Sequence, residues 1–356
     1  GFAPSWQVFA ALRFVCGTSI ACILVVFYTY IVELIRPEQR VFMRSFFNWG
    51  YARMVFTIVC MLCDHWRSAS IATSLLASPT LLAIAFMLPE TPKWYISKGR
   101  HADAKRSAAT LKYLSGREDE GILTDVHTIH AGKAYTMKDL LGDRSTAFKT
   151  LILCTLWFAT SLSAFGSDLN SGNLLGDFYF NQIVSGAVTA FAKIFVFFLD
   201  TYWKSFDRRK LHQLPQVFVI LCYSAIMCLQ IFAPESSCDG KSAKDWAIII
   251  LNIIGVSFIE LTWDACYLIG VESFPTHIRT IGMGTCSLAA RVGALVAPQM
   301  AYLSIFYRPA PYIVVVAVGL ISLIISLVFL TDTKGVDLAT IGEEQREENN
   351  EKFDLR

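Results

Sequence analysis

Long apolar segments dominate this 356-residue chain and constrain what it can fold into. An α-helix needs about 20 apolar residues to cross a bilayer core about 30 Å thick. Because lipid offers the backbone no hydrogen-bond partners, and because these segments are too long and too uniformly apolar for barrel strands, they predict membrane-spanning helices. The sequence therefore predicts an all-α membrane protein with nine transmembrane helices. They are Phe9–Val32, Ser45–Cys63, Ala69–Leu88, Ala147–Gly166, Leu174–Asp200, Pro215–Ala233, Trp246–Gly270, Ile281–Phe306 and Tyr312–Leu330.

The longest polar stretch, residues 89–146, separates three apolar segments in residues 1–88 from six in residues 147–330. Lys and Arg concentrate in this stretch, in the charged tail at 331–356 and in alternate loops. Since basic residues accumulate in cytoplasmic loops, we expect a cytoplasmic helical linker at 89–146 and a cytoplasmic C-terminal tail.

Several function classes are excluded by motifs that the sequence lacks. It has no GxxxxGK[ST] loop for an ATP-driven pump and no GxSxG or HExxH motif for a hydrolase. Cys60 and Cys63 form a CxxC pair without a second pair, so no metal site is expected. We expect that the protein is not an enzyme, uses no cofactor and binds no nucleic acid. Its expected surroundings are the lipid bilayer, and the sequence predicts no oligomeric state.

Four basic side chains lie inside the apolar segments: Arg13, Arg53, Lys193 and Arg291. A basic residue at the centre of a membrane helix costs about 2.5–3.5 kcal/mol on insertion scales. Each therefore predicts a position that faces a watery cavity or a neighbouring helix. For Arg53 we expect pairing with Glu33 or Glu38.

Three landmarks resemble the organic ion transporters of the major facilitator superfamily. They are "LPETPKWYISKGRHADA" at 88–104, "ESFPTHIRTIGMG" at 272–284 and "TDTKGVDLATIGEE" at 331–344. They are similar to the family's sequences after its sixth helix, before its eleventh and after its twelfth. The resemblance implies a major facilitator fold lacking its first three helices, located in the plasma membrane.

Further residues resemble the organic anion branch of that family. "ARVG" at 290–293 places an arginine where cation carriers tend to have an aspartate, and "GAVTAFAK" at 186–193 places a lysine in the eighth helix. "WFATS" at 157–161 is similar to the branch's seventh helix. The chain departs from the branch at Ala164 and Phe165, where an aromatic pair is expected, and at "DRRK", where a glycine is missing.

The resemblance implies secondary active transport of organic anions by alternating access, as an antiport of external anions against internal dicarboxylates. The sequence leaves two alternatives open: a carrier of organic cations or zwitterions, and a non-transporting membrane fragment. If the chain is a carrier of either anions or cations, its partner besides the bilayer is a small organic ion, the substrate.

Arg291 is the first candidate for contact with an anionic substrate, because a guanidinium is always charged and can grip a carboxylate bidentately. Its helical face-mates are small, which suits a cavity wall; the alternative is a structural salt bridge. Lys193 is the second candidate, with snorkelling or pairing to Asp200 as alternatives.

Glu260 and Asp264 form an acidic pair four residues apart on one apolar segment, and Tyr267 continues their face. Two like charges there require a cation or a proton. One hypothesis is that a carboxylate balances Arg291 or Lys193 until an anion enters. The others are proton coupling and recognition of cationic substrates.

Aromatic and polar residues near these charges complete the predicted site. Trp157, Ser161 and Phe165 share one helical face and suit a planar aromatic anion, with simple packing as the alternative. Predicted gating residues are Arg13, Glu33, Asp207, Arg208 and Arg209. The "DRRK" segment would be a latch that pairs with acidic residues at helix ends, or a topology signal.

Overall fold

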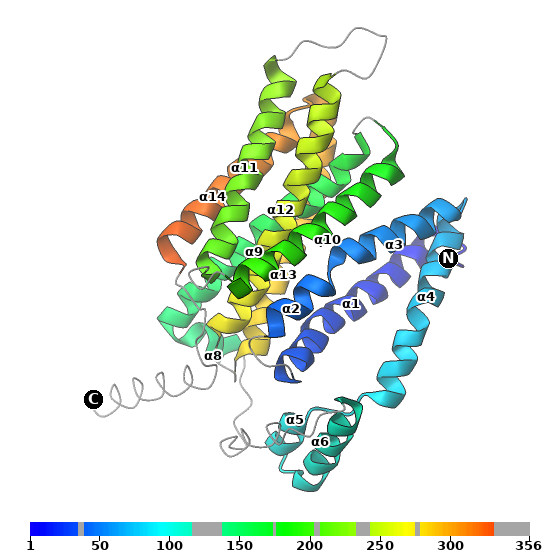
Figure 1. Cartoon of the computed structure of the whole chain (residues 1–356), viewed down its shortest axis with the longest axis vertical. Helices are drawn as coiled ribbons and strands as arrows, with labels where there is room; N and C mark the ends of the chain where they lie inside the picture. Colours follow the sequence, from blue (N-terminus) through cyan, green and yellow to red (C-terminus); the bar gives the residue numbers. More distant parts are fainter. Residues whose placement is uncertain are drawn as a thin grey trace, which may run out of the picture. The chain divides into compact units, whose positions relative to one another are not determined.

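The computed structural model describes residues 1–34, 39–115, 137–173, 176–202, 207–232, 243–274 and 278–330, and all its elements are helical (Figure 1). The expected all-α fold class is confirmed. The chain divides into two units, Gly1–Arg40 with Val59–Tyr135, and Val41–Ile58 with Thr136–Arg356. The helices are α1 (Trp6–Leu34), α2 (Gln39–Phe46), α3 (Trp49–Leu62), α4 (Trp66–Met87), α5 (Pro92–Ser97), α6 (His101–Ser115), α8 (Met137–Gly142), α9 (Arg144–Asn170), η1 (Ser171–Asn173, a 3₁₀ turn), α10 (Phe178–Tyr202), α11 (Arg208–Phe232), α12 (Ala243–Ser273), α13 (Arg279–Phe306) and α14 (Ala310–Phe329).

Within the described ranges, seven helices are long and apolar enough to cross a membrane: α4, α9, α10, α11, α12, α13 and α14. Each overlaps one of the predicted segments. The predicted segment Phe9–Val32 lies within α1, which has 29 residues.

The predicted segment Ser45–Cys63 is not one helix, because α2 ends at Phe46 and α3 begins at Trp49. Asn48 joins the two ends. Its Nδ2 donates to the Ser45 carbonyl at 2.7 Å, and its Oδ1 accepts from the Gly50 N–H at 2.8 Å. This side chain satisfies backbone groups that helix ends leave unpaired, as an N-cap residue does. The result is a 14-residue α3, shorter than a full span.

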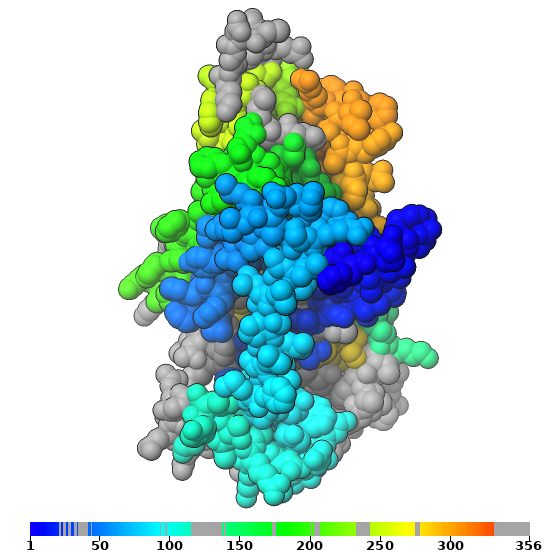
Figure 2. Space-filling view, turned by 90° about the vertical axis from the view of Figure 1, so that its right-hand side faces the viewer, coloured from blue at the N-terminus to red at the C-terminus, as the bar shows by residue number. Residues whose placement is uncertain are grey.

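In the first unit, the sequence after α4 builds the helix pair α5 and α6. Thr91 caps α5, and its Oγ1 accepts from the Trp94 N–H at 3.2 Å. The Ser107 hydroxyl of α6 donates to the Glu90 carbonyl. The Ser107 bond fixes α6 to the chain that enters α5. Figure 2 shows α4 leading into the cyan lobe that α5 and α6 form.

In the second unit, α9 packs along α13, and α11 packs against α12 and α14. Small residues permit the closest approaches, as is common between membrane helices. A Cβ at Gly293 of α13 would lie 2.6 Å from the Phe158 carbonyl oxygen of α9, so the two backbones touch there. The buried apolar core includes Leu162, Val219, Tyr223, Ile226, Ile259, Met300 and Val315.

Candidate substrate and gating site

A polar stripe on α10 lies along the inner side of the second unit. Its members recur every three or four residues, which places them on one helical face. From one end to the other they are Gln182, Ser185, Thr189 and Lys193. Each has a partner on another element: Ser171 at the end of α9, Arg53 of α3, Ser257 of α12 and the acidic pair of α12, respectively. The stripe therefore ties α10 to three of its neighbours.

Lys193 lies between two carboxylates. Its Nζ is 2.9 Å from Asp264 Oδ2 and 3.3 Å from Glu260 Oε2, and the lysine is only 3% exposed. Lys193 is thus a cation that pairs with both members of the acidic pair in this conformation. A buried ion pair is tolerated when its geometry repays the desolvation of both charges. Here two carboxylates face one ammonium, so the fully ionised cluster carries an excess negative charge.

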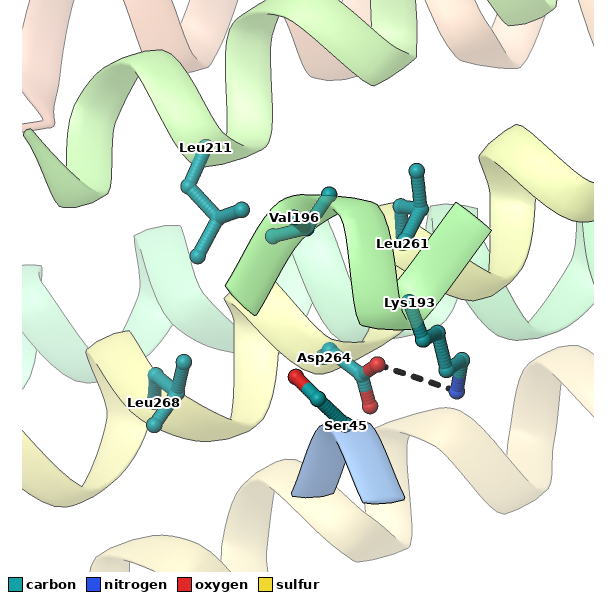
Figure 3. Close-up of a pocket in the computed structure, with 7 residues that line it drawn as sticks. All are labelled: Ser45, Lys193, Val196, Leu211, Leu261, Asp264 and Leu268. Carbon is teal, nitrogen blue, oxygen red and sulfur yellow. Dashed lines mark ion pairs between the residues drawn. The ribbon is translucent and has the colours of Figure 1, made fainter. Parts of the chain in front are cut away.

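A small pocket opens beside this cluster (Figure 3). It has about 10 Å³ of free space, close to what one water molecule requires. Figure 3 shows the Lys193 ammonium turned toward Asp264, with Ser45 of α2 next to that carboxylate. In this conformation the pocket has room for water but none for an organic ion. Its lining consists of Ser45, Lys193, Val196, Leu211, Leu261, Asp264 and Leu268.

Arg291 lies elsewhere, on an exposed face of α13 near the middle of that helix. The opposite face of α13 packs on α9, where Ser161 donates to the Ala290 carbonyl at 2.6 Å. Within the described part of the chain, Arg291 forms no ion pair. Gly284 lies on the same face of α13, about two turns before Arg291. A Cβ built at Gly284 would have no atom within 4 Å, so this face of α13 is uncovered at Gly284.

The predicted aromatic and hydroxyl residues of α9 do not form one surface. Trp157 is 1% exposed, packs against Trp263 and Tyr267 with ring centroids 5.4 and 4.4 Å away, and donates to the Cys266 carbonyl at 3.3 Å. Ser161 is fully buried, whereas Phe165 is exposed. In this conformation, Trp157 and Ser161 hold α9 to its neighbours.

The predicted latch residues find acidic and backbone partners. Arg208 is buried, and its Nε lies 3.3 Å from both carboxylate oxygens of Glu272 at the end of α12. Arg209 donates to the Leu327 carbonyl. Asp207 and Lys210 pair at 3.3 Å on the surface. The segment thus joins the start of α11 to the ends of α12 and α14.

The other two predicted gating residues belong to α1. The Arg13 guanidinium lies 5.5 Å from the centre of the Phe9 ring. The side chain of Glu33 lies outside the described residues, as does Glu38.

Arg53 has a carboxylate partner on α9 that the sequence did not predict. It pairs with Asp168 near the end of α9, and its Nη1 donates to Ser185 of α10 at 3.5 Å. The expected partners, Glu33 and Glu38, have side chains outside the described residues. The signal that could have found the partner was Asp168 itself, an isolated carboxylate beside an apolar segment that needs a cation from another helix.

Comparison with known proteins identifies the family. Residues 1–344 match the family model described as Sugar (and other) transporter. The Caenorhabditis elegans protein F23F12.3 is 55% identical over 99% of this chain and 69% of its own length. A Xenopus laevis solute carrier family 22 member 15-like protein is 25% identical over 95% of this chain and 67% of its own, and a Drosophila melanogaster organic cation transporter protein is 27% identical over 91% and 59%. The chain thus spans between 59% and 69% of these relatives.

A solved structure supports the same fold. This chain is similar to the inward open conformation of the xylose transporter XylE from E. coli, with a TM-score of 0.51 at 15% sequence identity. The match covers 87% of this chain and 67% of the XylE chain. At this identity the likeness concerns the fold alone. The family match over residues 1–344 shows that the chain belongs to the sugar (and other) transporter family of the major facilitator superfamily, and the seven apolar helices among the described residues are those of a multi-pass membrane protein.

Proposed function

We propose that the protein is a secondary active transporter that moves organic anions across the plasma membrane by alternating access, in exchange for internal anions. Its C-terminus would face the cytoplasm. The observation that carries this proposal is the contrast between Arg291 and three other cations of the second unit. Arg53, Lys193 and Arg208 are each matched by carboxylates, whereas Arg291 has none among the described residues.

The position of Arg291 supports an anionic ligand. A guanidinium near the middle of a membrane helix is unfavourable against lipid, so its exposed face should meet water, protein or ligand. The small residues around it, Gly284, Ser287 and Ala294, leave room for a carboxylate to approach. A low dielectric strengthens the attraction once water is excluded, and the planar donors favour bidentate binding. Arg291 would therefore select the sign of the substrate's charge.

Lys193 plays a different part in this proposal. Its charge is already balanced, so it contributes to anion binding only if Glu260 or Asp264 gives way. That displacement would couple substrate entry to a rearrangement between α10 and α12. Phe165, Trp157, Ser161 and Tyr267 remain candidates for contact with an aromatic part of the substrate once the helices move apart.

The direct test is initial uptake by the purified chain in proteoliposomes, with a panel of labelled aromatic monoanions, dicarboxylates, organic cations and zwitterions. We expect uptake of anions, accelerated when the vesicles contain a dicarboxylate. If the rate of anion uptake is the same with and without a dicarboxylate inside the vesicles, exchange is contradicted. A chain that moves no solute would be a non-transporting fragment.

A second candidate, an organic cation or zwitterion carrier, is favoured by the excess carboxylate around Lys193 and by the name of the Drosophila relative. In that case the panel would show cation uptake. Glu260→Gln and Asp264→Asn would abolish it, while Arg291→Asp would leave it intact. Proton coupling predicts that these amide variants lose the pH dependence of uptake.

A further inference from the structure

We infer that Arg53 and Asp168 form a gate, an ion pair that closes the bundle at one end and must open for a substrate to pass there. Neither residue belongs to the predicted gating set. The inference rests on the proposed alternating-access function, because only a carrier whose helices part in turn requires such a gate.

Arg53 joins helices that come from opposite sides of the predicted linker. It lies on α3, which precedes residues 89–146, whereas Asp168 and Ser185 lie on α9 and α10, which follow them. The Arg53 guanidinium reaches both, through the ion pair with Asp168 and a 3.5 Å bond to the Ser185 hydroxyl. One side chain therefore holds three helices together at the end where α9 terminates.

Beneath the pair, α3 and α10 cross in close contact. A Cβ at Gly50 of α3 would lie 2.5 Å from the Gly186 carbonyl oxygen, and one at Gly186 would lie 2.8 Å from Met54 Cγ. The two helix backbones thus touch, and no solute fits between α3 and α10 in this state. Substrate passage at this end requires that contact to separate.

The two charge clusters that contact the polar stripe of α10 differ in exposure. The Arg53 side chain is 11% exposed and Asp168 35%, so water can solvate the carboxylate when the pair breaks. The cluster around Lys193 is more buried, with side-chain exposures of 4%, 11% and 14%. Ser185 and Lys193 are separated by eight residues, or about 12 Å along a helix. The more exposed pair is the one that can open at low cost.

A labelling experiment tests the gate without any substrate. Ser185→Cys places a thiol next to Arg53. Mass spectrometry measures the reaction of this thiol with a membrane-impermeant maleimide and distinguishes it from the reaction of the native cysteines. We expect Arg53→Ala or Asp168→Asn to accelerate labelling by about tenfold or more, since hydrogen bonds to charged groups are worth more than neutral ones. The exchanged pair Arg53→Asp with Asp168→Arg should restore slow labelling.

The control is Arg100→Ala, which breaks an exposed surface pair with Asp103 and should leave the labelling rate unchanged. The exchanged pair guards against unfolding of the alanine variant, because it should restore both slow labelling at position 185 and uptake. Labelling that is equally fast with the pair intact, broken or exchanged would overturn the gate. Absence of anion uptake by the unmodified chain would instead overturn the proposed function, whatever the labelling shows.

Discussion

Lys193 illustrates what a single buried ammonium requires of its surroundings. It lies 2.9 Å from one carboxylate and 3.3 Å from another, on a helix that is largely apolar elsewhere. The three charges do not balance, because two carboxylates face one lysine. Removing the lysine therefore differs in kind from removing either acid.

This asymmetry gives a stability prediction. Lys193→Met leaves two buried carboxylates without their cation and should destabilise the protein by about 3–5 kcal/mol, the usual effect of breaking a buried pair. Glu260→Gln and Asp264→Asn each leave one lysine facing one acid, so each should have a smaller effect. Asp264→Asn should be the worse of the two because its contact is shorter. Thermal unfolding of the purified variants measures this order.

Two further variants complete the comparison. Lys193→Met combined with both amide changes should recover much of the lost stability, since no uncompensated charge remains. Lys210→Met, in an exposed pair with Asp207, should change stability by about 1 kcal/mol or less. Equal losses for the lysine and amide variants would show that the excess charge is unimportant.

For single residues, the sequence predicted the unusual side chains better than their partners. The spacing of Glu260 and Asp264 showed that a cation or a proton must answer them, but it could not choose between Lys193 and Arg291. That choice depends on the register between α10 and α12, which is a property of packing. Asp168, the partner that the structure shows for Arg53, was missed for the same reason, since it is 115 residues away in sequence.

Among the helices, the crossing of α3 and α10 depends on Gly50 and Gly186. Gly50→Ala would place a Cβ 2.5 Å from a backbone oxygen and 2.8 Å from the backbone nitrogen of Ala190. Backbone atoms cannot move aside as a flexible side chain can, so we expect destabilisation of about 1–3 kcal/mol. Thermal unfolding in the same detergent provides the measurement.

Gly284 supplies the matched control, because it also lies in a membrane helix and a Cβ added there would have no atom within 4 Å. Gly284→Ala should be neutral or slightly stabilising, as alanine is the better helix former by about 0.5–1 kcal/mol. If both substitutions are neutral, the close crossing of α3 and α10 does not exist in the membrane.

The helices themselves were predictable because length and uniform hydrophobicity are local properties. The break between α2 and α3 was missed, although Asn48 was visible in the sequence as a residue that favours helix N-caps. The hydrogen bonds of Asn48 to Ser45 and Gly50 end α2 and begin α3. A hydropathy profile cannot reveal such hydrogen bonds.

For the molecule as a whole, the family match and the seven apolar helices among the described residues show a membrane transporter. The arrangement of charges adds the proposal for what it carries. Three cations of the second unit are matched within the protein, whereas Arg291 lies on an exposed face of α13. The predicted orientation places the linker and the tail in the cytoplasm, where their basic residues are favoured.

The role proposed for Arg291 is tested by comparing initial uptake of a labelled organic anion and a labelled organic cation by the unmodified chain, Arg291→Lys and Arg291→Asp. We expect anion uptake by the unmodified chain and partial uptake by Arg291→Lys, because bidentate contact is lost. Arg291→Asp should lower anion uptake by about a hundredfold, as expected when a charge partner is reversed. Anion uptake by Arg291→Asp at the unmodified rate would show that this guanidinium does not bind the substrate.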